Sequence, residues 1–83
     1  MIEIKFENNK SVAYNENKKV GECDFVEEDN VWNIVHTEVD SSYQGQGIAR
    51  KLVELVIENA KIQNKKLIAD CSYANKVISK HLN

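Results

Sequence analysis

Two closely spaced glycines, Gly45 and Gly47, mark the point at which the spacing of apolar residues changes. Before them, apolar and polar residues alternate, as in the segment from Ile2 to Phe6, which is the period of a half-buried strand. After them, apolar residues recur at three- and four-residue steps, the period of a helix with one buried side. A chain of 83 residues has room for one small core. The sequence therefore predicts a single domain over residues 1–83, with a sheet in its first half and helices in its second.

Clusters of polar turn residues divide the first half into expected strands, which lie at residues 2–6, 11–14, 20–26 and 31–39. Turns at such short intervals are typical of an antiparallel meander. A helix is expected from Gln46 to about Gln63, then a short strand at residues 66–71 and a last helix that Ser72 would cap. Strand 31–39, helix 46–63 and strand 66–71 would form a β-α-β unit with parallel strands. The expected fold class is α/β (α+β with a mixed sheet): a β-meander, the β-α-β unit and a C-terminal helix.

The charge balance argues against binding to nucleic acid. The chain carries 11 Lys and Arg against 13 Asp and Glu, for a net charge of −2, whereas nucleic-acid binding usually needs a basic surface. No apolar run approaches the roughly 20 residues that cross a bilayer, and the N-terminus does not resemble a signal peptide. We therefore expect a cytoplasmic protein with no membrane contact. Cys23 and Cys71 stand far apart without CxxC or HxxxH spacing, so neither a disulfide nor a metal site is expected.

The glycines belong to the segment from Gln44 to Ala49, between an expected strand and an expected long helix. Glycine permits backbone conformations and close approaches that other residues forbid. Unpaired N–H groups and the positive end of the helix dipole would make this helix start an anion site, at the strand end where open α/β sheets bind ligands. Arg50 and Lys51 favour a bound anion, because cations in the first turn of a helix are otherwise unfavourable. The alternative is a tight connection that binds nothing.

This segment resembles the acetyl-CoA signature of the GNAT superfamily of N-acetyltransferases. The signature reads Gln or Arg, two residues, Gly, any residue, then Gly or Ala, after a strand. Gln44, Gly47 and Ala49 fill it, and Gly45 matches a frequent extra glycine. The resemblance implies that backbone amides from Gln44 to Ala49 hold the pyrophosphate of coenzyme A. It also implies that the pantetheine arm lies along Val39, between the splayed parallel strands.

A narrower resemblance, to the minimal GNAT-like proteins, runs from about Ile2 to His81. It rests on His36-Thr37-Glu38-Val39, the glycine turn, Cys71-Ser72-Tyr73 and Ile78-Ser79-Lys80-His81. It implies a truncated GNAT-like fold, with a histidine and a cysteine at the positions of His36 and Cys71 as the active-site pair. The cofactor-binding residues expected from the turn and the two resemblances are Thr37, Val39, Gln44, Gly45, Gln46, Gly47, Ile48, Ala49, Arg50, Ser72 and Tyr73.

Cys71 and His36 are also candidates on physical grounds. Neighbouring parallel strands lie about 4.8 Å apart and would bring the two residues to the same end of the sheet. Cys71 precedes an expected helix, an environment that lowers the pKa of a thiol, and a nearby histidine could stabilise the thiolate or act as a general base. The alternative is that Cys71 is a small buried apolar residue and His36 a strand residue held by packing.

The leading hypothesis is acetyl transfer from acetyl-CoA to an unidentified acceptor such as an amine. Either Cys71 takes the acetyl group first, with His36 as the base, or the acceptor attacks the thioester directly and His36 transfers the proton. Strand N–H groups near Thr37 and Val39 would polarise the thioester carbonyl. The alternatives are a non-catalytic acyl-CoA-binding or sensing module, and an interaction domain whose turn binds nothing. The chain has no space for the elements that shape the acceptor site in full GNAT domains, and nothing in it indicates an oligomeric state.

Overall fold

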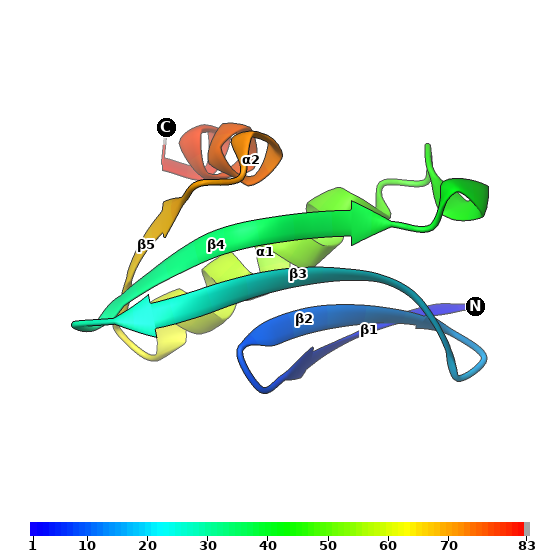
Figure 1. Ribbon diagram of the computed structural model, residues 1–83, viewed down its shortest axis with the longest axis horizontal. Helices are drawn as coiled ribbons and strands as arrows, with labels where there is room; N and C mark the ends of the chain where they lie inside the picture. Colours follow the sequence, from blue (N-terminus) through cyan, green and yellow to red (C-terminus); the bar gives the residue numbers. More distant parts are fainter. Residues whose placement is uncertain (83) are drawn as a thin grey trace.

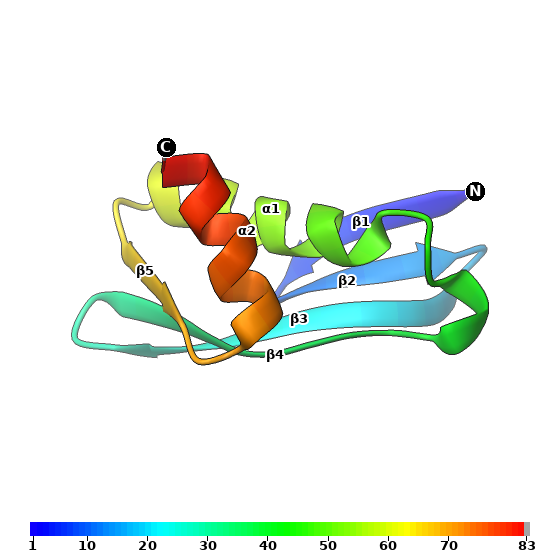
Figure 2. The same ribbon diagram turned by 90° about the horizontal axis from the view of Figure 1, so that it is seen from above.

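The computed structural model describes residues 1–82 and consists of a five-stranded sheet with two helices on one face (Figures 1 and 2). The strands are β1 (Ile2–Glu7), β2 (Lys10–Asn15), β3 (Lys18–Glu28), β4 (Val31–Val39) and β5 (Lys66–Ala69), in this order across the sheet. A 3-10 turn, η1 (Ser41–Tyr43), follows β4, and the helices are α1 (Ile48–Ile62) and α2 (Ser72–Leu82). β1 to β4 form an antiparallel meander and β5 is parallel to β4. The predicted fold class is confirmed.

The core lies between the sheet and the helices, where the two apolar periods meet. The residues of α1 that are buried there are Ile48, Leu52, Val53, Val56, Ile57 and Ala60. On the sheet, Phe25 stacks on Trp32 with ring centroids 4.1 Å apart, and Phe6 stacks on both. The buried Ser11 hydroxyl donates to the Leu52 carbonyl at 2.7 Å, which fixes α1 against β2. This packing holds the beginning of α1 next to the end of β4.

A bulge in β4 changes which side chains face the helices. Consecutive residues of β3 lie opposite Ile34 and His36, so Val35 has no partner on β3. An extra residue of this kind shifts the in-and-out alternation of the strand by one. Before the bulge, the even-numbered Ile34 is buried in the core. Beyond it the odd-numbered Thr37 faces the helices, and His36 and Glu38 are exposed.

Within residues 1–82, no helix is long and apolar enough to cross a membrane. Over the same residues, no group of three or more His, Cys, Asp or Glu side chains is arranged to hold a metal ion. Both cysteines are free thiols.

Candidate functional site

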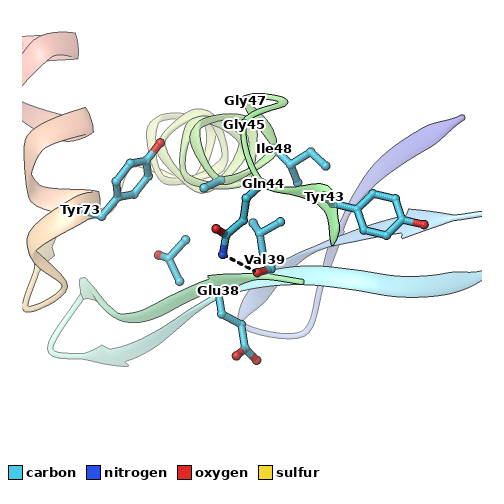
Figure 3. A pocket seen from close by; sticks show the side chains of 10 residues that line it. Glu38, Val39, Tyr43, Gln44, Gly45, Gly47, Ile48 and Tyr73 are labelled. Carbon is cyan, nitrogen blue, oxygen red and sulfur yellow. Dashed lines mark hydrogen bonds between the residues drawn. The ribbon is translucent and has the colours of Figure 1, made fainter. Parts of the chain in front are cut away.

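A cavity of about 580 Å³ opens where the end of β4, the beginning of α1 and the beginning of α2 meet (Figure 3). Its walls come from residues 37–49, which run from the end of β4 into α1, and from the beginning of α2, much later in the sequence. The lining residues are Thr37, Glu38, Val39, Tyr43, Gln44, Gly45, Gly47, Ile48, Ala49 and Tyr73. A cavity of this size falls within the range of small-molecule and cofactor sites.

The glycine turn forms the wall at the beginning of α1. Gly45 and Gly47 have φ angles of 84° and 77°, a region that L side chains rarely adopt, and Gly47 is the N-cap of the helix without a side-chain hydrogen bond. The first intrahelical bond runs from the Lys51 N–H to the Gly47 carbonyl at 3.2 Å. The N–H groups of Ile48 and Ala49, like that of the residue after them, therefore have no acceptor within the helix.

The space beside this turn is open. A Cβ added to Gly45 or to Gly47 would meet no heavy atom within 4 Å. The glycines are therefore needed for their backbone angles rather than for close packing within the chain. No acidic side chain lies in the first turn of α1 to satisfy the positive end of the helix. Open N–H groups, a positive helix end and free space are the features that anion-binding helix starts share.

Arg50 does not point its charge into this cavity. Its Nε lies 3.1 Å from Oε2 of Glu54, and Nε2 of His81 lies 3.1 Å from the same oxygen. Burial acts to raise the pKa of Glu54, but the contacts from His81 and Arg50 outweigh it and leave the pKa lowered. The conflict between Arg50 and the helix dipole is thus relieved within the chain, which weakens the expectation that it requires a bound anion.

The connection between β4 and α1 is long and anchored, rather than tight. It spans residues 40–47 and includes η1, which Asp40 caps by accepting the Ser42 N–H at 2.9 Å. The Asn15 side-chain amide donates to the Tyr43 hydroxyl at 2.9 Å, which ties the connection to β2. Gln44 points into the cavity, and its Nε2 donates to the Val39 carbonyl at 3.4 Å (Figure 3).

The two parallel strands separate next to the cavity. β5 pairs with β4 only as far as Ile34, although β4 continues to Val39. The chain then leaves β5, and the N–H groups of Asp70 and Cys71 both donate to the Ile34 carbonyl, at 3.0 and 3.2 Å. Residues 35–39 therefore present a strand edge without a β5 partner, which is the splayed arrangement that the resemblance implied. Such an edge can pair with an extended ligand.

Cys71 occupies the N-cap of α2. The N–H of Asn75 donates to the Cys71 carbonyl at 3.0 Å, which is the first intrahelical bond, and Ser72 is the first residue of the helix. The prediction that Ser72 is the cap is therefore wrong by one residue. A sulfur at the N-cap meets the N–H groups of the first turn directly.

This position lowers the pKa of the Cys71 thiol. Burial acts to raise the pKa, but the backbone N–H of Ala74, the Thr37 hydroxyl and the backbone N–H of Tyr73 outweigh it. Thr37 Oγ1 lies 3.6 Å from the Cys71 sulfur and 3.5 Å from that of Cys23. Burial raises the pKa of Cys23, which is fully enclosed, to about 11. Of the two thiols, only Cys71 is suited to react as a thiolate.

Among the hydrogen bonds of residues 1–82, His36 has none to Cys71, so the expected catalytic pair stays a prediction. Its Nε2 lies 3.6 Å from Oε2 of Glu38, and the Glu38 side chain points away from the cavity, toward the face without helices (Figure 3). Thr37, by contrast, contacts Cys71 on the helix face. Because consecutive strand residues point to opposite faces, the His36 side chain faces away from the side on which Thr37 contacts Cys71. The bulge at Val35 is the physical reason.

Most of the other predicted site residues converge. Those that line the cavity are Thr37, Val39, Gln44, Gly45, Gly47, Ile48, Ala49 and Tyr73. Gln46, Arg50 and Ser72 are not among its lining residues. Sequence reasoning missed Tyr43 and Glu38. Tyr43 precedes the signature and no spacing indicates its contact with Asn15, whereas Glu38 lines the cavity although its side chain points away.

Comparison with known proteins gives a consistent assignment. Residues 5–83 match the family described as GCN5-related N-acetyl-transferase. A search of curated proteins gave no significant match. The solution structure of a GCN5-like protein from Staphylococcus aureus, classed with the N-acetyltransferases, is 37% identical, with a TM-score of 0.73 over 95% of this chain and 79% of that one.

More distant structures share the fold alone. The ribosomal-protein-S18-alanine N-acetyltransferase of Escherichia coli is 17% identical, with a TM-score of 0.72, and the match covers 86% of this chain and 49% of that one. The PaiA N-acetyltransferase of Thermoplasma acidophilum, solved with coenzyme A, is 12% identical, with a TM-score of 0.63, and the match covers 68% and 35%. The present chain spans less than half of either protein. The family match over nearly the whole chain, on a fold that sets the glycine turn at the start of α1, shows that this protein belongs to the GCN5-related N-acetyltransferase family.

Proposed function

We propose that this protein binds acetyl-CoA and transfers its acetyl group to an acceptor such as an amine. The observation that carries the proposal is the continuity of one cavity. Gly47, at the open N–H groups of α1, and Thr37, which contacts the Cys71 sulfur, line the same space. Cys71 is not itself among the lining residues and reaches the cavity through its contact with Thr37. Open N–H groups in one part of the cavity and Thr37 beside this thiol in another match the two ends of an acyl-CoA arm.

The pyrophosphate belongs at the beginning of α1. The free N–H groups of Ile48 and Ala49 would donate to its oxygens, and the helix dipole would add to the attraction. The open space beside Gly45 and Gly47 admits the phosphates without a clash. Arg50 is already paired with Glu54, so the main-chain groups supply the contact.

The pantetheine arm belongs along the open edge of β4. Its amide groups would pair with the main chain of residues 35–39, as an added strand does. The Val39 carbonyl now accepts from the Gln44 side chain at the long distance of 3.4 Å. Gln44 would release this carbonyl to a pantetheine N–H and turn toward the cofactor.

The thioester then lies near Thr37 and Cys71. In the covalent route the Cys71 thiolate attacks the carbonyl carbon, the C–S bond to coenzyme A breaks and its thiolate leaves. An acceptor amine next attacks acetyl-Cys71, which releases the Cys71 thiolate, and the amine loses a proton to solvent. Thr37 and the first N–H groups of α2 support this thiolate, so the route needs no contact with His36. In the direct route the amine attacks the bound thioester itself.

Intact mass spectrometry after incubation with acetyl-CoA tests the function and separates the routes. The covalent route predicts one added acetyl group on the wild type and on Cys23→Ala, but none on Cys71→Ala. An unmodified Cys71, with transfer to amines that survives Cys71→Ala, would leave the direct route. Binding without transfer to any amine in a broad screen would identify an acyl-CoA-binding module instead. Failure to bind at millimolar acetyl-CoA would overturn both readings.

A further inference from the structure

A second, smaller cavity adjoins the first and is strongly basic. It has a volume of about 140 Å³ and lies between the beginning of α1 and α2. We call it the basic groove; its lining residues are Arg50, Tyr73, Lys76, Val77, Lys80 and His81. Tyr73 lines both cavities. Ala49 lines the first cavity and Arg50 the groove, so the two spaces meet at consecutive residues of α1.

The charge of the basic groove stands out against a chain whose net charge is −2. Glu54 contacts both Arg50 and His81 and offsets part of the positive charge. Among the residues that the structure describes, Lys76 and Lys80 form no ion pair. They are four residues apart in α2, a spacing at which like charges destabilise a helix. An anion in the groove would remove this repulsion.

The orientation proposed for the cofactor indicates which of its anionic groups would lie in the basic groove. With the pyrophosphate at Gly47 and the thioester toward Thr37, the arm occupies the β4 side of the turn. The adenosine end lies beyond the pyrophosphate, at the beginning of α1, where the first cavity gives way to the basic groove between Ala49 and Arg50 and where α2 lies beside α1 (Figure 2). The basic groove is therefore within reach of a group on the adenosine. The adenosine of coenzyme A is joined to the pyrophosphate through the 5′ oxygen of its ribose. The 3′ oxygen of the same ribose carries a further phosphate.

We propose that the basic groove binds the 3′-phosphate of the cofactor, with Lys76 and Lys80 as its main ligands and Arg50 at its edge. The proposal rests on the proposed function and adds a specificity to it. The protein selects cofactors that carry the 3′-phosphate over those that lack it. The selectivity comes from α2, outside the glycine signature.

Isothermal titration of the full chain with acetyl-CoA and with acetyl-dephospho-CoA, which lacks only the 3′-phosphate, tests the proposal. We expect the wild type to bind acetyl-CoA about tenfold more tightly, the effect of one or two charge-assisted contacts near the surface. Lys76→Ala/Lys80→Ala should reduce this preference to about twofold and leave the affinity for acetyl-dephospho-CoA unchanged. Lys5→Ala/Lys61→Ala removes two exposed lysines elsewhere and should keep the preference.

The possible failures can be told apart. Equal affinity of the wild type for the two cofactors would overturn the groove proposal and leave the proposed function intact. A preference that survives Lys76→Ala/Lys80→Ala would place the 3′-phosphate elsewhere. If the lysine pair instead governs transfer to carboxylate-bearing amines without changing the cofactor preference, the groove serves the acceptor and the proposal falls. Binding of neither cofactor would contradict the proposed function itself.

Discussion

At the scale of single residues, the Cys71 thiol is the group with the clearest chemical prediction. Alkylating reagents attack the thiolate, so the rate rises with pH through the pKa of the thiol. Because the pKa of Cys71 is lowered, we expect its alkylation rate to be half-maximal at a lower pH than that of an ordinary cysteine in an unfolded peptide. Peptide mapping with iodoacetamide across pH would measure this. Cys23, with a pKa of about 11 and no exposed surface, should stay unmodified in the folded protein.

Three variants test what lowers this pKa. Thr37→Val removes the hydroxyl beside the sulfur and should slow alkylation at neutral pH by roughly three- to tenfold, while Thr37→Ser should restore it. His36→Ala should leave the rate unchanged, because the His36 side chain lies on the other face of the sheet. A large loss in His36→Ala would contradict this placement. The sequence predicts a helix start next to Cys71, although it places the cap one residue too late, at Ser72. No local pattern marks the bulge at Val35 that turns His36 away.

At the scale of elements, the periods of the sequence predicted all five strands and both α-helices, to within two residues at each bound that was given, but not the short helix η1. The reason is physical: the meander and both helices are amphipathic, and their turns carry residues that accept a positive φ, such as Asn17, Asn30 and Asn64. The separation of β4 from β5 has no such local signature, because it depends on where α2 begins rather than on strand composition. It could be expected only from the resemblance.

The glycine turn before α1 should contribute both to stability and to acetyl-CoA binding. Gly47→Ala places a side chain at a φ of 77°, which should cost about 1–2 kcal/mol in the free energy of unfolding. It also puts a methyl group beside the open N–H groups, so the affinity for acetyl-CoA should fall at least tenfold. Asn64→Ala is the matched control, since its φ is 61° at the other end of α1. Urea unfolding should show a lower free energy of unfolding for both variants. Calorimetric titration should show a weaker affinity for acetyl-CoA in Gly47→Ala alone. If Gly47→Ala binds acetyl-CoA as tightly as the wild type, the turn is not part of the binding site.

At the scale of the whole molecule, one small core supports every part of the site. The end of β4 and the turn before α1 follow one another in the chain, whereas the start of α2 comes much later and is brought to them by the packing of both helices on the sheet. Gly21 shows how close this packing is. A Cβ there would lie 3.0 Å from the Glu38 carbonyl oxygen and 3.3 Å from Leu52. The sequence does not reveal these two close contacts, because Gly21 stands within an ordinary strand pattern.

A ligand that bridges these three segments should stabilise the entire fold. A chain of 83 residues has a free energy of unfolding of about 4–12 kcal/mol, and a ligand at 100 times its Kd adds about 2.7 kcal/mol. Acetyl-CoA at that concentration should therefore raise the unfolding midpoint by about ten degrees or more, as thermal unfolding followed by circular dichroism would record. Acetyl-pantetheine, which lacks the pyrophosphate, should raise it far less at the same concentration, because it cannot reach the N–H groups of α1. Equal shifts from the two ligands would place the binding energy along β4 and leave the glycine turn without its proposed role.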